Sequence, residues 1–266
     1  MANAVVIHLY RRSESSGSCA NFFYCTAPMK GVSQMMEKQD TRTIVSQYAE
    51  HFLEEHFGEK PDKLTVILHP PFLLIHLTGF LLPAEKMLVQ RQDWNRVLET
   101  RDLMICSLKA DLLTGLQERI GQPLTDLYVD WNLEKKSGLM IATMEKDEDL
   151  DEWPWPEAVD QETLKEIILL NSIRTQKKPD QTNFYWLNDQ VLLIERIGIL
   201  VEVEKNLVQN GIIEELRLAK RPLEHRITKL FNLESLLNGR VQDLFVDWNF
   251  HMDFSYMVLM LEKPQS

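Results

Sequence analysis

The chain has 266 residues, of which 44% are hydrophobic and 26% are charged, and its formal net charge at pH 7 is −11. This composition is typical of a globular protein with a sizeable core, and the length fits one large domain or two of ordinary size. The acidic balance excludes a general nucleic-acid binder, which needs a basic face to displace counterions from phosphates. Eight of the acids lie between Asp147 and Glu162, so one segment carries most of the excess charge.

Neither the cysteines nor the apolar runs indicate secretion or a membrane anchor. Three cysteines, an odd and low number, favour a reducing cytoplasm over a disulfide framework. The longest apolar run, residues 70–83, is too short to cross a bilayer, so we expect no transmembrane segment. Residues 1–36 share nothing with the pattern downstream. We expect these residues to be a disordered tail. Alternatively, the start codon is placed too early, and Met35 or Met36 is the true start.

The first patterned region, residues 37–146, predicts the element order α-β-β-α-β-β. Apolar residues about four apart after Ile44 predict an amphipathic helix, with Asp40 or Thr41 as its cap and Gly58 as its stop. Runs of β-formers, a proline that can begin a short helix and one long apolar stripe complete the region. We expect strands at 63–69, 72–79, 124–133 and 137–145, a short helix from Pro83, and a long helix that runs from Trp94 to Gly121.

The second region, residues 163–266, repeats this order. "DLYVDWN" (126–132) recurs as "DLFVDWN" (243–249), and "LLPAEKMLVQ" (81–90) as "LVEVEKNLVQ" (200–209). Matching phrases in the same order favour duplication, so the expected fold class is α+β: two tandem α-β-β-α-β-β domains, each a small mainly antiparallel sheet packed by a long helix. Residues 147–162 read as an acidic Trp/Pro linker. We expect strands at 182–188, 190–198, 241–250 and 255–263, and Pro222 should kink or divide the second long helix.

The repeated strand phrase has two interpretations. Alternate residues of a strand face opposite sides, so Leu127, Val129 and Trp131 form a core face, while Asp130 lies on the other side between Tyr128 and Asn132. Asp130, and Asp247 in the second copy, are therefore candidate ligand-binding residues. In the alternative, which we favour, the Asp and Asn side chains end the strand by bonding to turn amides. We find no second acid, histidine or nucleophile on that face.

The Glu-Lys phrase is a second candidate. Lys86 follows the predicted helix start at Pro83, where free N–H groups and a lysine could bind a small anion. Lys205 is its counterpart, but Glu202 replaces the proline there and would repel an anion, so the first copy is the better host. An exposed surface lysine is the simpler alternative. The spacings give no metal ligand set, no phosphate-binding glycine loop and no catalytic motif, so we expect no metal and no cofactor. Trp153 and Trp155 either pack on a domain or anchor a partner.

A family resemblance rests on two runs in the first copy. "DKLTVILHPPFLLIHLTGFLLPAEKMLV" (62–89) and "LYVDWNLEKKSGLMIATME" (127–145) resemble the bacterial MpsC domain, long catalogued as a domain of unknown function. The second copy is more divergent but keeps Glu204, Lys205 and the Val-Asp-Trp strand. The resemblance implies a link to a membrane potential-generating, cation-translocating system that is connected with inorganic carbon uptake. It supplies no catalytic residues.

Together these observations predict a cytoplasmic, non-enzymatic accessory or regulatory protein of a bacterial membrane cation-translocating and bicarbonate uptake system. It would contact the membrane only through a partner subunit. The alternative is a small-anion or metabolite sensor that uses Lys86, Asp130, Lys205 and Asp247. An enzyme would need an acid/base pair assembled across the two domains. A homodimer, and whether the two sheets merge, are left open by the sequence.

Overall fold

The computed structural model describes residues 30–145 and 153–262, which we call the N-terminal half and the C-terminal half. The N-terminal half consists of α1 (Lys30–Phe57), β1 (Lys63–His69), β2 (Phe72–Thr78), α2 (Pro83–Gln90), α3 (Trp94–Ile120), β3 (Leu124–Asn132) and β4 (Ser137–Met144). The C-terminal half consists of α4 (Gln161–Thr175), β5 (Gln181–Asn188), β6 (Val191–Ile197), α5 (Glu202–Gln209), α6 (Glu214–Thr228), α7 (Leu233–Leu236), β7 (Val241–Asn249) and β8 (Phe254–Leu261).

The two halves share one sheet topology. Each has a four-stranded antiparallel sheet, in the order β1-β2-β4-β3 and β5-β6-β8-β7. The predicted α+β class with two small antiparallel sheets is therefore confirmed, and the sheets do not merge. In both sheets the strand with the repeated phrase, β3 or β7, lies at an edge.

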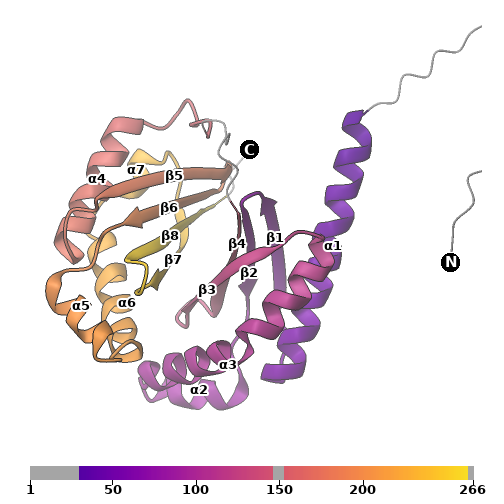
Figure 1. Cartoon of the computed structure of the whole chain (residues 1–266), viewed down its shortest axis with the longest axis horizontal. Coiled ribbons are helices and arrows are strands. Elements are labelled where there is room, and N and C mark those ends of the chain that lie inside the picture. The colour runs from indigo at the N-terminus through magenta and orange to yellow at the C-terminus, as the bar shows by residue number, and fades with distance from the viewer. Residues whose placement is uncertain (1–29, 146–152, 263–266) are drawn as a thin grey trace, which may run out of the picture.

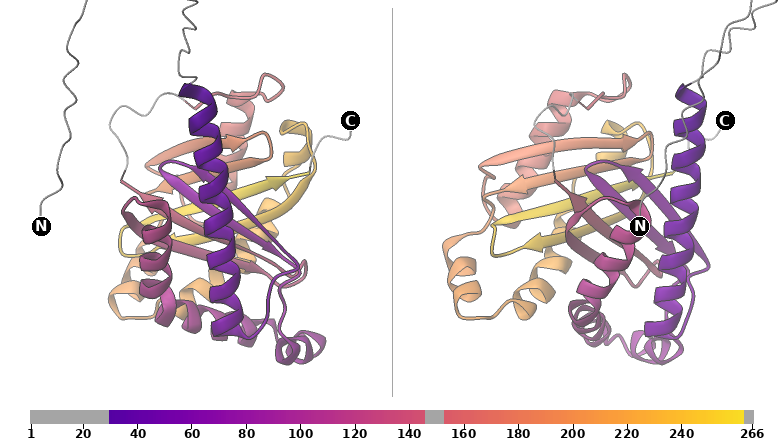
Figure 2. Two further views of the ribbon diagram at one scale, coloured as in Figure 1. Left: turned by 90° about the vertical axis from the view of Figure 1, so that its right-hand side faces the viewer. Right: turned by 45° about the vertical axis from the view of Figure 1, so that its right-hand side comes forward.

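The sheets stack face to face, with helices outside. Figure 1 shows α1 and α3 over the outer face of the first sheet and α4, α6 and α7 over that of the second. The strands of the two sheets cross one another in both views of Figure 2. A hydrophobic cluster joins the inner faces and includes Phe72, Tyr128, Tyr185, Phe245 and Tyr256. Four layers, helix–sheet–sheet–helix, follow from this arrangement.

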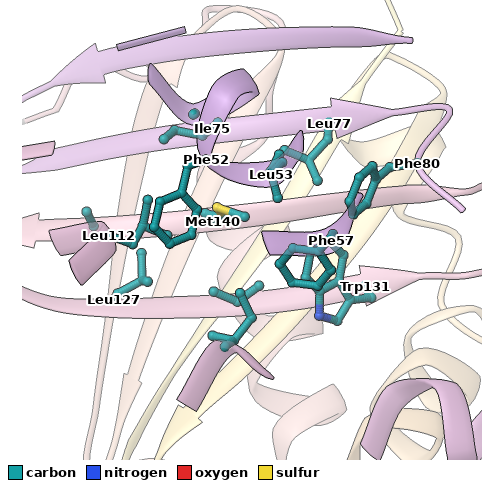
Figure 3. Close-up of a cluster of buried hydrophobic side chains, with 14 of the residues drawn as sticks. Phe52, Leu53, Phe57, Ile75, Leu77, Phe80, Leu112, Leu127, Trp131 and Met140 are labelled. Carbon is teal, nitrogen blue, oxygen red and sulfur yellow. The ribbon is translucent and has the colours of Figure 1, made fainter. Parts of the chain in front are cut away.

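The outer face of the first sheet carries the core of the N-terminal half. In Figure 3, Phe52 and Phe57 of α1 lie over Met140 and Trp131 of the sheet. Leu127 and Trp131 of the repeated phrase point into this cluster, as the alternation of the strand predicts. Burial of each such large apolar side chain stabilises the fold by roughly 1.5–3 kcal/mol.

Several predicted boundaries shift. The helix α1 begins at Lys30, so residues 30–36 are helical rather than tail, and neither Asp40 nor Thr41 starts the helix. Residues 32–41 contain no glycine or proline that would stop it. Gly58 and Gly121 end their helices at positive φ, as expected. The remaining tail, residues 1–29, and Cys19 and Cys25 within it lie outside the described residues.

Pro222 does not divide its helix. The helix α6 is continuous from Glu214 to Thr228 with the proline inside it, and the chain leaves the helix only at Lys229 before α7. A proline costs one backbone hydrogen bond and a steric clash. Contacts of α6 with β7, α3 and α4 hold the helix together across that defect.

The part of the acidic segment that the structure describes, from Trp153 onward, packs on both halves through its tryptophans. Trp153 packs on His69, with ring centroids 4.2 Å apart, and on Tyr185, at 5.3 Å, so it bridges both sheets. Trp155 packs on Phe184 and Trp186. Packing on the domains, one of the two predicted roles, is therefore confirmed.

The Glu-Lys phrase is structural through its glutamate. Glu85 accepts the Leu82 N–H at the start of α2, over 2.8 Å. It also forms a bidentate pair with the fully buried Arg101, with atoms 2.6 and 2.7 Å apart. The C-terminal half repeats this pair as Glu204 and Lys220, whose atoms are 2.5 Å apart. Each buried ion pair links a short helix, α2 or α5, to the longer helix that follows it, α3 or α6.

The core of the C-terminal half is polar at places where the core of the N-terminal half is apolar. Positions 119 residues apart are equivalent before the last two strands, as the two Glu-Lys phrases show. Arg196 and Glu224, both buried and 3.0 Å apart, stand where Leu77 and Ile105 lie in the first core. Further polar side chains follow the same pattern: Asn171, Ser172 and Gln176 stand where Phe52, Leu53 and Phe57 lie in the first core.

Removal of Arg101 should destabilise the protein far more than removal of its neighbour in the phrase. Arg101→Ala leaves the buried Glu85 without a cation, so we expect a loss of about 3–5 kcal/mol in the free energy of unfolding. Lys86→Ala removes an exposed side chain and should change it by less than about 0.5 kcal/mol. Urea unfolding midpoints measure both. Equal losses would show that the ion pair is not what holds α2 to α3.

Candidate functional site

The repeated strands β3 and β7 lie against each other where the two sheets meet, and we call this contact the intersheet interface. It is formed by the faces of the phrase that carry Asp130 and Asp247. Both aspartates are buried there, with 2% and 7% of their surface exposed. The interface therefore uses the polar face of the phrase, while the apolar face serves the core of each half.

The two aspartates exchange hydrogen bonds across the interface. The Val129 N–H donates to Oδ2 of Asp247, and the Val246 N–H donates to Oδ2 of Asp130, both over 2.8 Å. Because β3 and β7 are edge strands, these N–H groups have no strand partner on that side. Each carboxylate thus satisfies the open edge of the opposite sheet.

A second reciprocal pair surrounds the first. The Asn132 amide donates to Asp243 over 2.7 Å, and the Asn249 amide donates to Asp126 over 3.3 Å. The asparagine oxygens accept backbone N–H groups in the following turns, from Lys135 and Met252. The turn-bonding interpretation is therefore correct for Asn132 and Asn249, while the aspartates of the phrase bond across the interface.

Two arginines of α6 neutralise the aspartates. Arg221 Nε lies 2.6 Å from Oδ1 of Asp130, and the same guanidinium lies 3.2 Å from Asp102 of α3. Arg217 forms an ion pair with Asp247. His225, one turn further along α6, has its Nε2 3.6 Å from Asp130. One helix of the C-terminal half therefore binds two carboxylates of the N-terminal half.

The pKa values of Asp130 and Asp102 are shifted in opposite directions. Burial alone would raise the pKa of Asp130, but Arg221, His225 and the Val246 N–H outweigh it and hold this pKa below its usual value. For Asp102 burial dominates over the attraction of Arg221, and it raises the pKa. Burial also lowers the pKa of Arg217. These shifts mark a dry ionic network rather than a solvated surface.

The four residues predicted from the sequence are divided between two places. Asp130 and Asp247 come together at the intersheet interface. Lys86 is exposed on α2, and Lys205 pairs with Asp253 over 3.1 Å. Within the described chain neither lysine forms an ion pair with Asp130 or Asp247. The start of α2 already holds the Glu85 carboxylate, which leaves little attraction for an anion beside Lys86.

Sequence reasoning missed a second acid on the polar face. Asp126 accepts the Tyr128 hydroxyl over 2.7 Å and pairs with Lys109, so the expectation of no second acid there is wrong. Strand alternation places residue 126 on the same side as Asp130, so the sequence alone is enough to identify this second acid. Arg217 and Arg221 could not be found by comparing the copies, because the equivalent positions hold Leu98 and Asp102.

Two pockets flank the intersheet interface. The larger, of about 490 Å³, lies between the β3–β4 turn, the end of α6 and the start of β7. The smaller, of about 160 Å³, lies between α3, β3, the start of α6 and the end of β7. No cluster of three or more His, Cys, Asp or Glu side chains that could bind a metal occurs in residues 30–145 and 153–262. None of the described helices is long and apolar enough to cross a membrane.

Comparison with protein families matches residues 37–146 to the family described as "Na+-translocating membrane potential-generating system (MpsC)". This part of the chain is similar to the MpsC family. The match covers α2 with its Glu-Lys phrase and the strand with Asp130, and it ends before the C-terminal half. Searches of curated proteins and of solved structures give no significant match.

Removal of either interface aspartate should weaken the fold strongly. Asp130→Ala leaves the Val246 N–H unsatisfied and takes one carboxylate from Arg221, so we expect a loss of about 3–5 kcal/mol in the free energy of unfolding. Asp247→Ala should cost a similar amount, because the exchange is reciprocal. Glu134→Ala, an exposed acid in the adjoining turn, is the matched control. If Asp130→Ala costs no more than this control in urea unfolding, the carboxylates do not hold the sheets together.

The opposite pKa shifts of Asp130 and Asp102 predict opposite pH dependences. The folded pKa of Asp130 lies below the unfolded value of about 3.9, so its stabilising contribution is complete above that value and is lost as pH falls through the folded pKa. The difference in unfolding free energy between wild type and Asp130→Asn should shrink below about pH 4.

Asp102 should behave in the reverse way. Its raised pKa means that the native state takes up a proton at a higher pH than the unfolded chain does. Wild type should therefore gain stability relative to Asp102→Asn as pH falls through the folded pKa. Urea unfolding between pH 7 and pH 3 measures both differences, and parallel curves for the two variants would contradict the assignment.

Proposed function

We propose that this protein is a non-enzymatic accessory or regulatory protein of a bacterial membrane cation-translocating system that is connected with bicarbonate uptake. It would act in the cytoplasm and reach the membrane through a partner subunit. The observation that carries this proposal is the match of residues 37–146 to a family described as a Na+-translocating membrane potential-generating system. The docked pair of halves would be the unit that the partner recognises.

Duplication of an MpsC domain is part of the same proposal. Apart from the additional helix α7, the element order recurs in both halves, as do the strand order and the buried ion pair between the phrase glutamate and a basic residue of the long helix. The hydrogen bonds across the interface are reciprocal. Reciprocal contacts are those of a two-fold interface between copies. The chain would then be a covalently joined pair of domains, and a further homodimer is not needed to bury the polar face of the phrase.

The charge pairing at the interface favours a binding role over catalysis. A general acid or base must reach the substrate within hydrogen-bonding distance. Asp130 and Arg221 are nearly fully buried and form an ion pair, and Asp247 is held by Arg217 and by the Val129 N–H. An acid/base pair built across the halves does exist here, but its partners stabilise the interface.

Affinity purification from native membranes tests the accessory role. The full chain, tagged and added to detergent-solubilised membranes of the source bacterium, should retain a membrane subunit of a cation transporter at low and moderate salt. The double variant Asp130→Ala/Asp247→Ala, which disturbs the docked pair, should retain less. Recovery of no transporter subunit under any salt condition would contradict the proposal.

The second candidate is a sensor of a small molecule, and the pocket of about 490 Å³ favours it, because that volume is in the range of ligand sites. A metabolite fits this observation better than an anion does, since the Asp243 carboxylate lies in the wall of the pocket. Lys86 and Lys205 lie on neither pocket wall. Calorimetric titration with bicarbonate, phosphate and nucleotides tests the anion version, and the absence of heat would remove it.

A further inference from the structure

The two pockets beside the intersheet interface occupy equivalent places in the two halves. Asp126 and Asp243, 117 residues apart, hold the same position in the repeated strand phrase, and each lines one pocket. On the long helices the spacing is 119, which the buried residues Arg101 and Lys220 fix. Lys109 of α3 is therefore equivalent to Thr228 of α6. Lys109 lines the smaller pocket, and Thr228 lines the larger one.

The smaller pocket contains an internal cation. The Lys109 ammonium pairs with Asp126 and lies 5.7 Å from the centre of the Tyr128 ring. The Tyr128 hydroxyl donates to the same carboxylate over 2.7 Å. In this half the aspartate at the start of the phrase is neutralised by the chain itself.

The larger pocket has no lysine at the equivalent position of α6. Asp243 is 3% exposed. In its surroundings Thr228 stands at the position equivalent to Lys109, and Phe245 at the position equivalent to Tyr128. The carboxylate accepts from neutral donors only, namely the Asn132 amide, the Ser137 hydroxyl and the Leu244 N–H. No basic side chain among residues 30–145 and 153–262 forms an ion pair with it. The nearby His76 also interacts with this carboxylate, but burial lowers the pKa of His76 and favours its neutral form. A buried carboxylate without an ion-pair partner is costly, and a bound cation would relieve that cost.

The remaining walls of the larger pocket are mixed. Its apolar side comes from Phe231, Leu233, Leu244 and Leu259. Lys135 also lines it, but its ammonium donates to the Gln242 carbonyl. The other charged or titratable groups on the wall are Glu134, His225, Lys229 and Glu234. The pocket therefore joins one buried carboxylate to an apolar surface and a charged rim.

We propose that this pocket binds a small organic amine, whose ammonium group contacts Asp243 in the place that Lys109 takes beside Asp126. The apolar body of the ligand packs on Phe231, Leu244 and Leu259. A bare metal ion fits less well, because the described residues offer no cluster of ligating side chains there. An anion is disfavoured by the buried carboxylate. The inference rests on the pocket alone and does not depend on the membrane role proposed above.

Titration of the full chain with three probes of one shape tests the charge requirement. Hexylamine, hexan-1-ol and hexanoate share the apolar body and differ in the head group. We expect hexylamine to bind at least about tenfold more tightly than hexan-1-ol, as a charge-assisted hydrogen bond to a buried carboxylate predicts. Hexanoate should give no heat. Equal binding of the amine and the alcohol, or no binding of the amine, would overturn the proposal.

Two variants place the ammonium at Asp243. Asp243→Asn keeps the shape of the side chain and should weaken hexylamine binding at least about tenfold. Thr228→Lys supplies an internal ammonium, as Lys109 does in the other half, and should abolish binding while the protein stays folded by circular dichroism. Asp160→Asn, an exposed helix cap elsewhere, should leave the affinity unchanged. If Asp243→Asn does not fold, Thr228→Lys and the alcohol comparison decide, and undiminished amine binding by either folded variant would refute the assignment.

Discussion

Two edge strands with open N–H groups meet between the sheets, and each is covered by a carboxylate from the other half. A buried N–H without a partner costs free energy, and an open strand edge can pair with other chains. Asp130 and Asp247 remove both problems at once. Because each aspartate serves the strand opposite to its own, the interface works only if both strands carry the phrase. This mutual requirement accounts for the nearly identical heptapeptides on the two strands.

The ionic network on α6 makes the interface asymmetric. Arg221 pairs with Asp102, its own equivalent on α3, which is the contact expected between two related helices that meet at an interface. Arg217 and His225 have no charged equivalents, since Leu98 and Cys106 stand in their places. The C-terminal half therefore supplies the cations and the N-terminal half most of the acids. Burial of so many charges is tolerated only because almost every one has a partner at hydrogen-bond distance.

Much of this fold can be read from the sequence. Alternation and helical spacing predict the strands, the long helices and the core face of the phrase, because these depend on local pattern. The partner of the polar face could not be predicted, since Asp130 meets the Val246 N–H only when the second sheet is in place. The same limit applies to Arg221 and to the continuity of α6 through Pro222, which tertiary contacts decide. Asp126 is different, because strand alternation alone places it beside Tyr128.

The joining of both halves in one chain has an evolutionary consequence. In a homodimer every substitution at a two-fold interface is made twice, so a cation lost from one pocket would be lost from both. A chain that encodes each side separately is free of this constraint. It can keep Lys109 on one side, where it neutralises Asp126, and place Thr228 on the other. One pocket is thereby available to specialise while its counterpart keeps an internal ion pair.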